Sequence, residues 1–354
     1  MKKWSISIIA VLGCIVIAIG ALVVIVDPYF HYHKPIAGLS YQLGNEAYRN
    51  DGVSKHFEYD SMITGTSMTR SFRVSEAEKL FGGKFIRITF QGEGMKRIND
   101  NLKMAIEAND DLKFVIRSVD PIWFVTDKDW MGYDEYPDYL YHDKLWNDVQ
   151  YLYNMEILME DVIPELVRTI RQVPAENYDN LVGDDDSLAG KEAVLREYAR
   201  PEKKEEKIDA EETEEYFDML DRNIEQNVVS TIRDNPDITF YIFFPPYSIC
   251  WWDSLNQNGT GILQRRIWME EYVIQKLLDY DNVRLFSFSN NFELVCDLNY
   301  YIDDVHYTDK ASSKILVWMK EGKFEVTKSN YMDYIEEITD FYLNFDYDSF
   351  FNDK

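Results

Sequence analysis

Two short segments, far apart in the chain, carry the residue types of a nucleophile and its base. Gly65-Thr66-Ser67 ends an apolar run, and Asp303 and His306 lie three positions apart near the C-terminal end. A serine hydroxyl is a weak nucleophile until a base takes its proton, and an imidazole is the better base when a carboxylate orients it. His306 is the last of the five histidines, so no other imidazole competes in that region. The pattern predicts acyl chemistry at Ser67; in the structural alternative, Thr66 or Ser67 only caps a helix.

Five short runs of mostly apolar residues predict the strands that position these groups. The runs are Tyr59–Thr64, Phe85–Phe90, Lys113–Val119, Thr239–Phe244 and Val283–Phe288. Nearly continuous apolar strands are typical of a sheet covered on both faces, and helical periodicity between them predicts crossover helices. We therefore expect an α/β fold: a three-layer sandwich with a mostly parallel five-stranded sheet. Ser67 would lie where the first strand reaches the carboxyl edge of that sheet.

The two segments resemble the blocks of the SGNH (GDSL-like) hydrolase superfamily. Gly65-Thr66-Ser67 stands where that family has Gly-Asp-Ser, with Thr66 in place of the aspartate, and Asp303 to His306 fits its Asp-x-x-His block. The resemblance implies a flavodoxin-like three-layer fold in which Ser67 is the nucleophile, His306 the base and Asp303 its orienting residue.

The oxyanion site that this resemblance implies is matched only in part. Gly92, preferred to Gly94, stands after the second strand and would donate a backbone N–H together with that of Ser67. The third block, usually Gly-x-Asn-Asp, is absent, because Arg117-Ser118-Val119-Asp120-Pro121 occupies its place. The usual asparagine donor is therefore missing, and Asp120 would orient a loop or the substrate instead.

A narrower resemblance is to the membrane-anchored SGNH-like proteins of the cell envelope, including the D-alanyl-transfer proteins of teichoic acid and partners of membrane-bound O-acyltransferases. It rests on Asp27-Pro28-Tyr29-Phe30 after an N-terminal anchor and on the segment 243–248 after the fourth strand. Prolines stop a strand and turn the chain over the sheet edge. Trp251 and Trp252 would then face the crevice or pack in the core. The candidate substrate-binding residues are Arg70, Asp120, Tyr247, Ser248 and Trp251.

The apolar run Trp4–Val26 predicts one membrane-spanning helix. At 1.5 Å per residue it is about 35 Å long, enough for a hydrocarbon core of about 30 Å. It is longer than the apolar core of a cleavable signal. It also continues well past Cys14, where a lipoprotein signal would have to end. Lys2 and Lys3 predict a cytoplasmic N-terminus and an external domain. The aromatic cluster Tyr29 to His33 would form an interfacial belt, an interpretation preferred to a metal site at His31 and His33.

The composition excludes several classes of function. A net charge of −26 argues against nucleic-acid binding, which needs clustered lysine and arginine. No clustered histidines suggest a metal, and no cofactor is expected. Three cysteines are too few for a disulfide framework. Cys250 and Cys296 could form one bridge or remain two free thiols.

The predicted organisation follows from these boundaries. A cytoplasmic stub (1–3) and the anchor (4–26) precede a juxtamembrane segment (27–58). The α/β domain (59–328) carries an insertion (121–220), and a C-terminal helix (329–354) packs on it. The insertion begins aromatic-rich, which suits either a lid or a plain hydrophobic sub-core. It then becomes strongly acidic over 175–215, as in a solvated segment.

We therefore expect a membrane-anchored serine esterase or O-acyltransferase that modifies a cell-surface glycopolymer through an acyl-Ser67 intermediate. The alternative is a catalytically idle module that binds such a polymer or a membrane-bound O-acyltransferase.

Overall fold

The computed structural model describes residues 2–133, 137, 140, 147–181, 189–204 and 210–352. The chain divides into two compact units, Met1–Glu58 with Tyr133–Leu181, and Tyr59–Gly132 with Val182–Lys354. Parts of the predicted insertion, including Trp146 and the positions 182–188 and 205–209 of the acidic stretch, lie outside the described residues.

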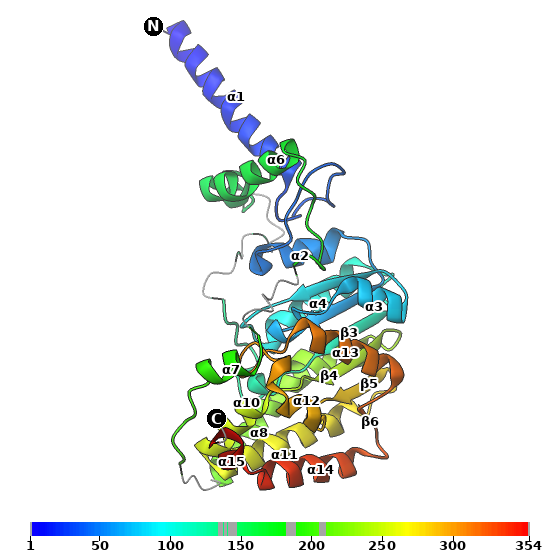
Figure 1. Ribbon diagram of the computed structural model, residues 1–354. Coiled ribbons are helices and arrows are strands. Elements are labelled where there is room, and N and C mark those ends of the chain that lie inside the picture. Colours follow the sequence, from blue (N-terminus) through cyan, green and yellow to red (C-terminus); the bar gives the residue numbers. More distant parts are fainter. Residues whose placement is uncertain are drawn as a thin grey trace. The chain divides into compact units, whose positions relative to one another are not determined.

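The second unit is an α/β domain built on a six-stranded sheet (Figure 1). Its strands are β1 (Ser61–Gly65), β2 (Phe85–Thr89), β3 (Phe114–Ser118), β4 (Thr239–Phe244), β5 (Val283–Ser287) and β6 (Glu325–Val326). They follow the order β2-β1-β3-β4-β5-β6, and every pair is parallel except β5 with β6. The first five strands lie where the apolar runs predicted them. The prediction of five strands was wrong by one, because the antiparallel β6 has only two residues and no apolar pattern.

Helices connect the strands and cover the sheet. They are η1 (Ser67–Thr69), α3 (Val74–Phe81), α4 (Met95–Ala108), η2 (Pro121–Trp123), α7 (Lys191–Glu197), α8 (Ala210–Ile224), η6 (Glu225–Val229), α9 (Ser230–Asp234), α10 (Ile249–Asn258), α11 (Thr260–Leu277), α12 (Phe292–Cys296), η7 (Leu298–Tyr300), α13 (Asp309–Glu321), α14 (Tyr331–Asn344) and α15 (Tyr347–Asn352). Because β1 lies between β2 and β3, right-handed crossovers place α3 and α4 on opposite faces. The helix α13 contacts α3, whereas α4 contacts η6.

The C-terminal segment forms two helices, α14 and α15, where one was expected. The chain is extended at Phe345, after α14. Trp252 is buried and stacks on Tyr342 of α14 with ring centroids 3.7 Å apart, so this tryptophan belongs to the core. Cys250 and Cys296 are free thiols.

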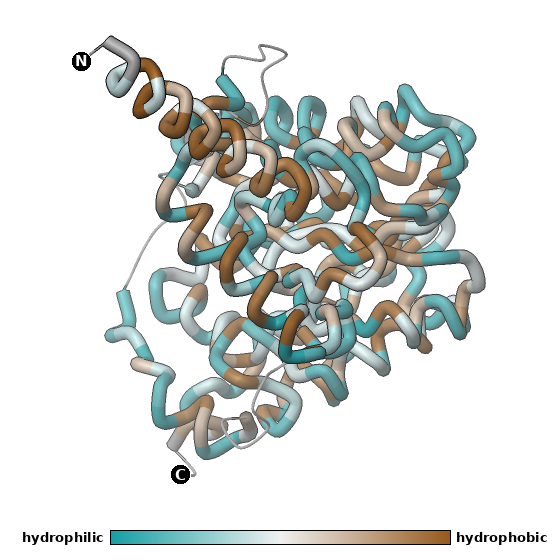
Figure 2. Tube along the Cα trace, turned by 90° about the horizontal axis from the view of Figure 1, so that it is seen from above, coloured by the Kyte–Doolittle hydropathy of each residue, from teal (hydrophilic) through white to brown (hydrophobic). Residues whose placement is uncertain are grey.

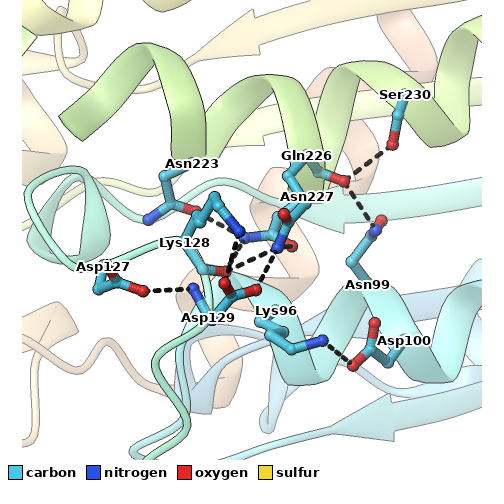
Figure 3. Close-up of polar contacts among 10 residues, drawn as sticks. All are labelled: Lys96, Asn99, Asp100, Asp127, Lys128, Asp129, Asn223, Gln226, Asn227 and Ser230. Atoms are coloured by element: carbon cyan, nitrogen blue, oxygen red, sulfur yellow. Dashed lines mark hydrogen bonds and ion pairs between the residues drawn. The ribbon is translucent and has the colours of Figure 1, made fainter. Parts of the chain in front are cut away.

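A polar network joins α4 and η6 to the loop after η2 (Figure 3). Asn227 Nδ2 donates to the carbonyl of Lys128 at 2.8 Å, and Gln226 Nε2 donates to Asp129 Oδ1 at 2.8 Å. The guanidinium of Arg117, which is fully buried in β3, donates to Asn99 Oδ1 and to the carbonyl of Asn227. The loop that follows β3 is therefore tied to η6, and the buried Arg117 ties η6 to β3 and α4.

The first unit contains the N-terminal helix and the segments around it. Its helices are α1 (Lys2–Val26), α2 (Glu46–His56), α5 (Val149–Leu152), η4 (Ile157–Val162) and α6 (Ile163–Ile170). Within α1, the span Trp4–Val26 is long and apolar enough to cross a membrane, as the brown colour of this helix in Figure 2 illustrates.

The turn after α1 is closed by Asp27, which is fully buried. Its carboxylate accepts hydrogen bonds from the backbone N–H groups of His31, Tyr32 and His33 and from the hydroxyl of Tyr151. This turn folds Tyr29 and Phe30 into the protein, where they are 4% and 2% exposed. The predicted interfacial belt is therefore wrong for these two rings.

Gly65, the last residue of β1, packs tightly against Ser118, the last residue of β3. Its φ is +156°, and a Cβ there would lie 2.2 Å from Ser118 Oγ and 2.8 Å from Thr69 Cγ2. Only glycine allows this approach without a shift of the strand end that leads to Ser67.

We expect Gly65→Ala to lower the free energy of unfolding of the α/β unit by about 2–4 kcal/mol, because it adds a steric clash to a backbone penalty. Gly82→Ala is the matched control, since Gly82 has a φ of +78° but no atom within 4 Å of a built Cβ; it should lose about 1–2 kcal/mol. Urea unfolding followed by tryptophan fluorescence measures both. Equal losses would show that the approach to Ser118 is unimportant.

Candidate functional site

Ser67 lies directly beyond the carboxyl end of β1, at the start of η1. Thr66 caps this turn, because its hydroxyl accepts the N–H of Met68 at 3.2 Å. The side chain of Ser67 is free for another partner, and its Oγ lies 2.7 Å from His306 Nε2. Capping by Thr66 and contact of Ser67 with the imidazole therefore coexist.

Asp303 holds the imidazole of His306 in a fixed orientation. Its Oδ2 lies 2.7 Å from His306 Nδ1, while its Oδ1 accepts the backbone N–H groups of Val305 at 2.8 Å and His306 at 2.6 Å. Because an ionised carboxylate only accepts hydrogen bonds, Nδ1 carries the proton. Nε2 of the neutral ring is then the acceptor of the Ser67 hydroxyl proton, which is the tautomer that a general base requires.

Asp303 and His306 each shift the pKa of the other, and both shifts favour the charged form of the side chain. The hydrogen bond to Asp303 raises the pKa of His306 above its usual value, although burial acts the other way. Burial acts to raise the pKa of Asp303, but its hydrogen bonds to His306 outweigh that effect and hold it below the usual range. The His306 side chain is 39% exposed, so a substrate can reach it.

Ser67 and Gly92 offer backbone N–H groups beside the same cavity. Both line it, and Gly92 has a φ of +72°, which favours glycine. Among the described residues, neither N–H has a hydrogen-bond acceptor within the protein. Two uncommitted donors next to the nucleophile are what an oxyanion intermediate needs. Gly94 is different, because its backbone packs against the ring of Trp130.

Asp120 lies near Thr66 and His306 and is buried at 2% exposure. Its Oδ2 accepts the hydroxyl of Ser118 at 2.8 Å and its Oδ1 that of Tyr247 at 3.0 Å. Burial raises the pKa of Asp120, against these hydrogen bonds and one from Thr66, while the charge of Asp120 raises the pKa of His306. This carboxylate accepts hydrogen bonds where the SGNH resemblance would place an amide donor.

Two adjoining cavities share Ser67, Gln91 and His306. One, of about 190 Å³, is also lined by charged groups, Arg70 and Asp303. The other, of about 340 Å³, has a largely apolar wall, whose members are Ile122, Trp123, Tyr247 and Val305. The site can therefore hold a polar group and an apolar group next to one nucleophile.

The predicted substrate-binding residues separate into two groups. Arg70 and Tyr247 line the cavities, and Arg70 donates to Gln91 Oε1 at 3.1 Å. Asp120, described above, lines neither cavity, and the same holds for Ser248 and Trp251. Ser248 caps α10 and its hydroxyl donates to the carbonyl of Asp304, while Trp251 is 8% exposed and stacks on Tyr247. Ser248 and Trp251 therefore contact residues next to the cavities but do not line them.

The sequence reasoning missed Gln91 and Trp123. Gln91 directly follows the second strand, beside Gly92, and that position was a usable signal. Trp123 stacks on Trp130 with centroids 4.9 Å apart. It belongs to the aromatic-rich start of the insertion, and no sequence pattern separates it from the other aromatic residues there. Within the described residues, no three His, Cys, Asp or Glu side chains come together in a way that could hold a metal ion.

The chain matches no family model and no curated protein. A similar solved structure is a protein from Streptococcus pneumonia that is provisionally described as a platelet activating factor. The two chains are 10% identical, the alignment covers 78% of this chain and 89% of that one, and the TM-score is 0.37. A similarity at this level transfers no activity.

The raised pKa of His306 predicts a pH profile. A base works only when neutral, so the rate at which a fluorophosphonate labels the protein should rise with pH through a pKa above 6.5 and then level off. Asp303→Asn should move this rise to lower pH and reduce the plateau by roughly two to four orders of magnitude, because the tautomer is no longer fixed. The second-order labelling rate constant between pH 5 and 9 is the measurement. An unchanged profile would mean that Asp303 does not act on His306.

Asp120→Asn should move the same rise to lower pH, by less than Asp303→Asn does. It removes a negative charge that raises the pKa of His306 but leaves the hydrogen bond to Asp303 intact. The same labelling assay measures it. A shift to higher pH would contradict this electrostatic role.

Proposed function

We propose that this protein is an SGNH-like serine esterase or O-acyltransferase that acts on a cell-surface polysaccharide or teichoic-acid-type polymer. The observation that carries the proposal is the hydrogen-bonded series Ser67–His306–Asp303 at the carboxyl edge of a mostly parallel sheet. The flavodoxin-like order of the first five strands supports the resemblance to SGNH hydrolases.

In the proposed reaction, Ser67 Oγ attacks the carbonyl carbon of an ester while His306 Nε2 takes the hydroxyl proton. The N–H groups of Ser67 and Gly92 donate to the resulting oxyanion, and Asp303 stabilises the imidazolium. When the intermediate collapses, the C–O bond to the alcohol breaks and His306 gives its proton to the leaving oxygen. The acyl group then remains on Ser67 as an ester.

The second half reverses these steps with a new acceptor. Water or a sugar hydroxyl gives its proton to His306 and attacks the acyl carbon, and Ser67 Oγ leaves with that proton. Water yields a carboxylic acid, whereas a sugar hydroxyl yields a new ester. The polar cavity beside Arg70 and Asp303 suits the hydroxyl-bearing acceptor, and the apolar wall around Trp123 suits the acyl chain.

The proposed location follows from the N-terminus. A helix able to span a membrane, with Lys2 and Lys3 on its short side, favours a cytoplasmic N-terminus and an external catalytic domain. A membrane-bound O-acyltransferase is the proposed partner, since it would supply acyl groups at the same surface. We propose no role for nucleic acid.

The second candidate is an anchored module that binds polymer or partner without catalysis. It is favoured by Asp120, an acceptor where the SGNH resemblance would have an amide donor. The two candidates differ in whether Ser67 is activated.

For an enzyme, we expect a fluorophosphonate to form one adduct on the full-length protein in detergent, located at Ser67 by mass spectrometry. Ser67→Ala should abolish it, and His306→Ala should slow it at least about a hundredfold, because a general base contributes roughly that much. Ser313→Ala, on α13 and away from both cavities, should label like the natural chain. No adduct on folded protein would favour the binding module.

A further inference from the structure

The helical segment η4–α6 carries apolar side chains on two sides. Ile157 and Val162 are buried in a cluster with Val23 and Val26 of α1. The opposite side exposes five residues at intervals of three or four. These residues, hereafter the apolar stripe, are Met155, Met159, Ile163, Val167 and Ile170, with exposed fractions of 65%, 54%, 38%, 37% and 79%. A helix that is apolar on both sides is normally covered on both.

The segment packs against the last part of α1, within the apolar span, and against Tyr29 just after it. A Cβ on Gly20 would lie 2.8 Å from the hydroxyl of Tyr153, just before η4, so this glycine permits a close approach. Val23 and Val26 belong to the same cluster as Ile157. The covered stretch of α1 therefore lies between Gly20 and Val26, inside Trp4–Val26.

The length of the uncovered span sets how deep this contact must lie. Trp4 to Ala18 are all exposed, and at 1.5 Å per residue they measure about 22 Å. A hydrocarbon core is about 30 Å thick. The remaining part of the hydrocarbon core, about 8 Å, must therefore be crossed by the stretch of α1 that η4–α6 covers, from Gly20 to Val26. The apolar stripe is then at the depth where interfacial helices bury their apolar side, about 5–10 Å.

Two of the four acidic groups of this segment are turned away from the apolar stripe. Asp161 Oδ1 lies 2.7 Å and Glu165 Oε1 3.6 Å from Arg49 Nη2, and Glu165 is buried. Glu156 and Glu160 are exposed beside Met155 and Met159, and Arg171 is exposed at the other end, whereas the exposed residues between 161 and 170 are Ile163, Val167 and Ile170. From 161 to 170 the exposed side of the segment is therefore apolar, as lipid contact requires.

We propose that the apolar stripe lies in the lipid of the membrane that α1 spans, so that η4–α6 forms a second, interfacial membrane contact. The proposal rests on the proposed span but not on the esterase activity. Both α1 and η4–α6 then contact the membrane. Together they fix the depth and tilt of the first unit in the membrane, whereas α1 alone would only attach it.

The test measures the depth of single nitroxide labels in the full-length protein in lipid vesicles. Cys14→Ala removes the one exposed thiol among the three cysteines, since Cys250 is buried and burial raises the pKa of Cys296 to about 11. Met159→Cys and Ile163→Cys are added singly to this background, and the background alone measures residual labelling. A label on the natural Cys14 reports the span, and Met332→Cys, 70% exposed on α14, is the matched apolar control outside the first unit.

We expect labels at positions 159 and 163 to collide with oxygen and to be shielded from a water-soluble nickel chelate. A label on Cys14 should behave in the same way. Their ratio of oxygen to nickel collisions should be several-fold above that at position 332. Nickel access at 159 and 163 with a shielded Cys14 would overturn the stripe proposal and leave the span intact. Nickel access at Cys14 as well would overturn both. Shielding from both reagents would mean that a protein partner covers the stripe, which also contradicts the lipid contact.

Discussion

The parallel pairing of β1 with both β2 and β3 is the constraint on which the site depends. Gly65 pairs with Thr89, and Thr64 pairs with Arg117, so the three strands end at one edge in a fixed register. Because of this register, the chain after each strand reaches the same place. Ser67, Gly92 and Asp120 come from three separate loops, yet each loop needs only two or three residues to enter the site. The close approach at Gly65 brings the loops after β1 and β3 together.

The electrostatics of the site follow from two carboxylates with different surroundings. Asp303 is half-buried and accepts three N–H donors, which favour its charged form. Asp120 is buried and meets only hydroxyl donors, so burial raises the pKa of its carboxyl. The first therefore orients the imidazole directly, whereas the second acts on it through space. An amide at position 120 would have supplied a donor but no such field.

Much of the fold was predictable because its strands are covered on both faces. Phe-Ile-Arg-Ile-Thr and Thr-Phe-Tyr-Ile-Phe-Phe are apolar enough to be recognised without any partner, and their order predicted which loops share an edge. The strand β6 has two residues, Glu325 and Val326, and is defined only by its pairing with β5. No sequence pattern of that length predicts a strand. The spacing of Asp303 and His306 predicted their proximity because a three-residue separation fits one turn.

Other features were hidden because they depend on tertiary contacts. Ser248 and Trp251 follow a proline pair as a crevice-lining loop would, but α10 starts at once and turns both inward. Tyr29 and Phe30 follow the span as a belt would, but Asp27 folds the chain back on itself. In both cases a local polar cap decides the direction of the aromatic rings. The amino-acid composition of these segments is the same whether the rings are exposed or buried, so it could not predict their direction.

The closure at Asp27 also makes α1 part of the first unit. Val23 and Val26 contribute to the core of the first unit, and the Asp27 carboxylate joins the turn after α1 to Tyr151 across more than a hundred residues. Cutting the chain after the turn would remove the buried side chains of Val23, Val26, Tyr29 and Phe30 and leave the Tyr151 hydroxyl without its acceptor. The helix is thus part of a folded unit, and not a tether attached to one. Helix α1 contributes its buried side chains to the first unit, whereas the α/β unit is a separate compact unit.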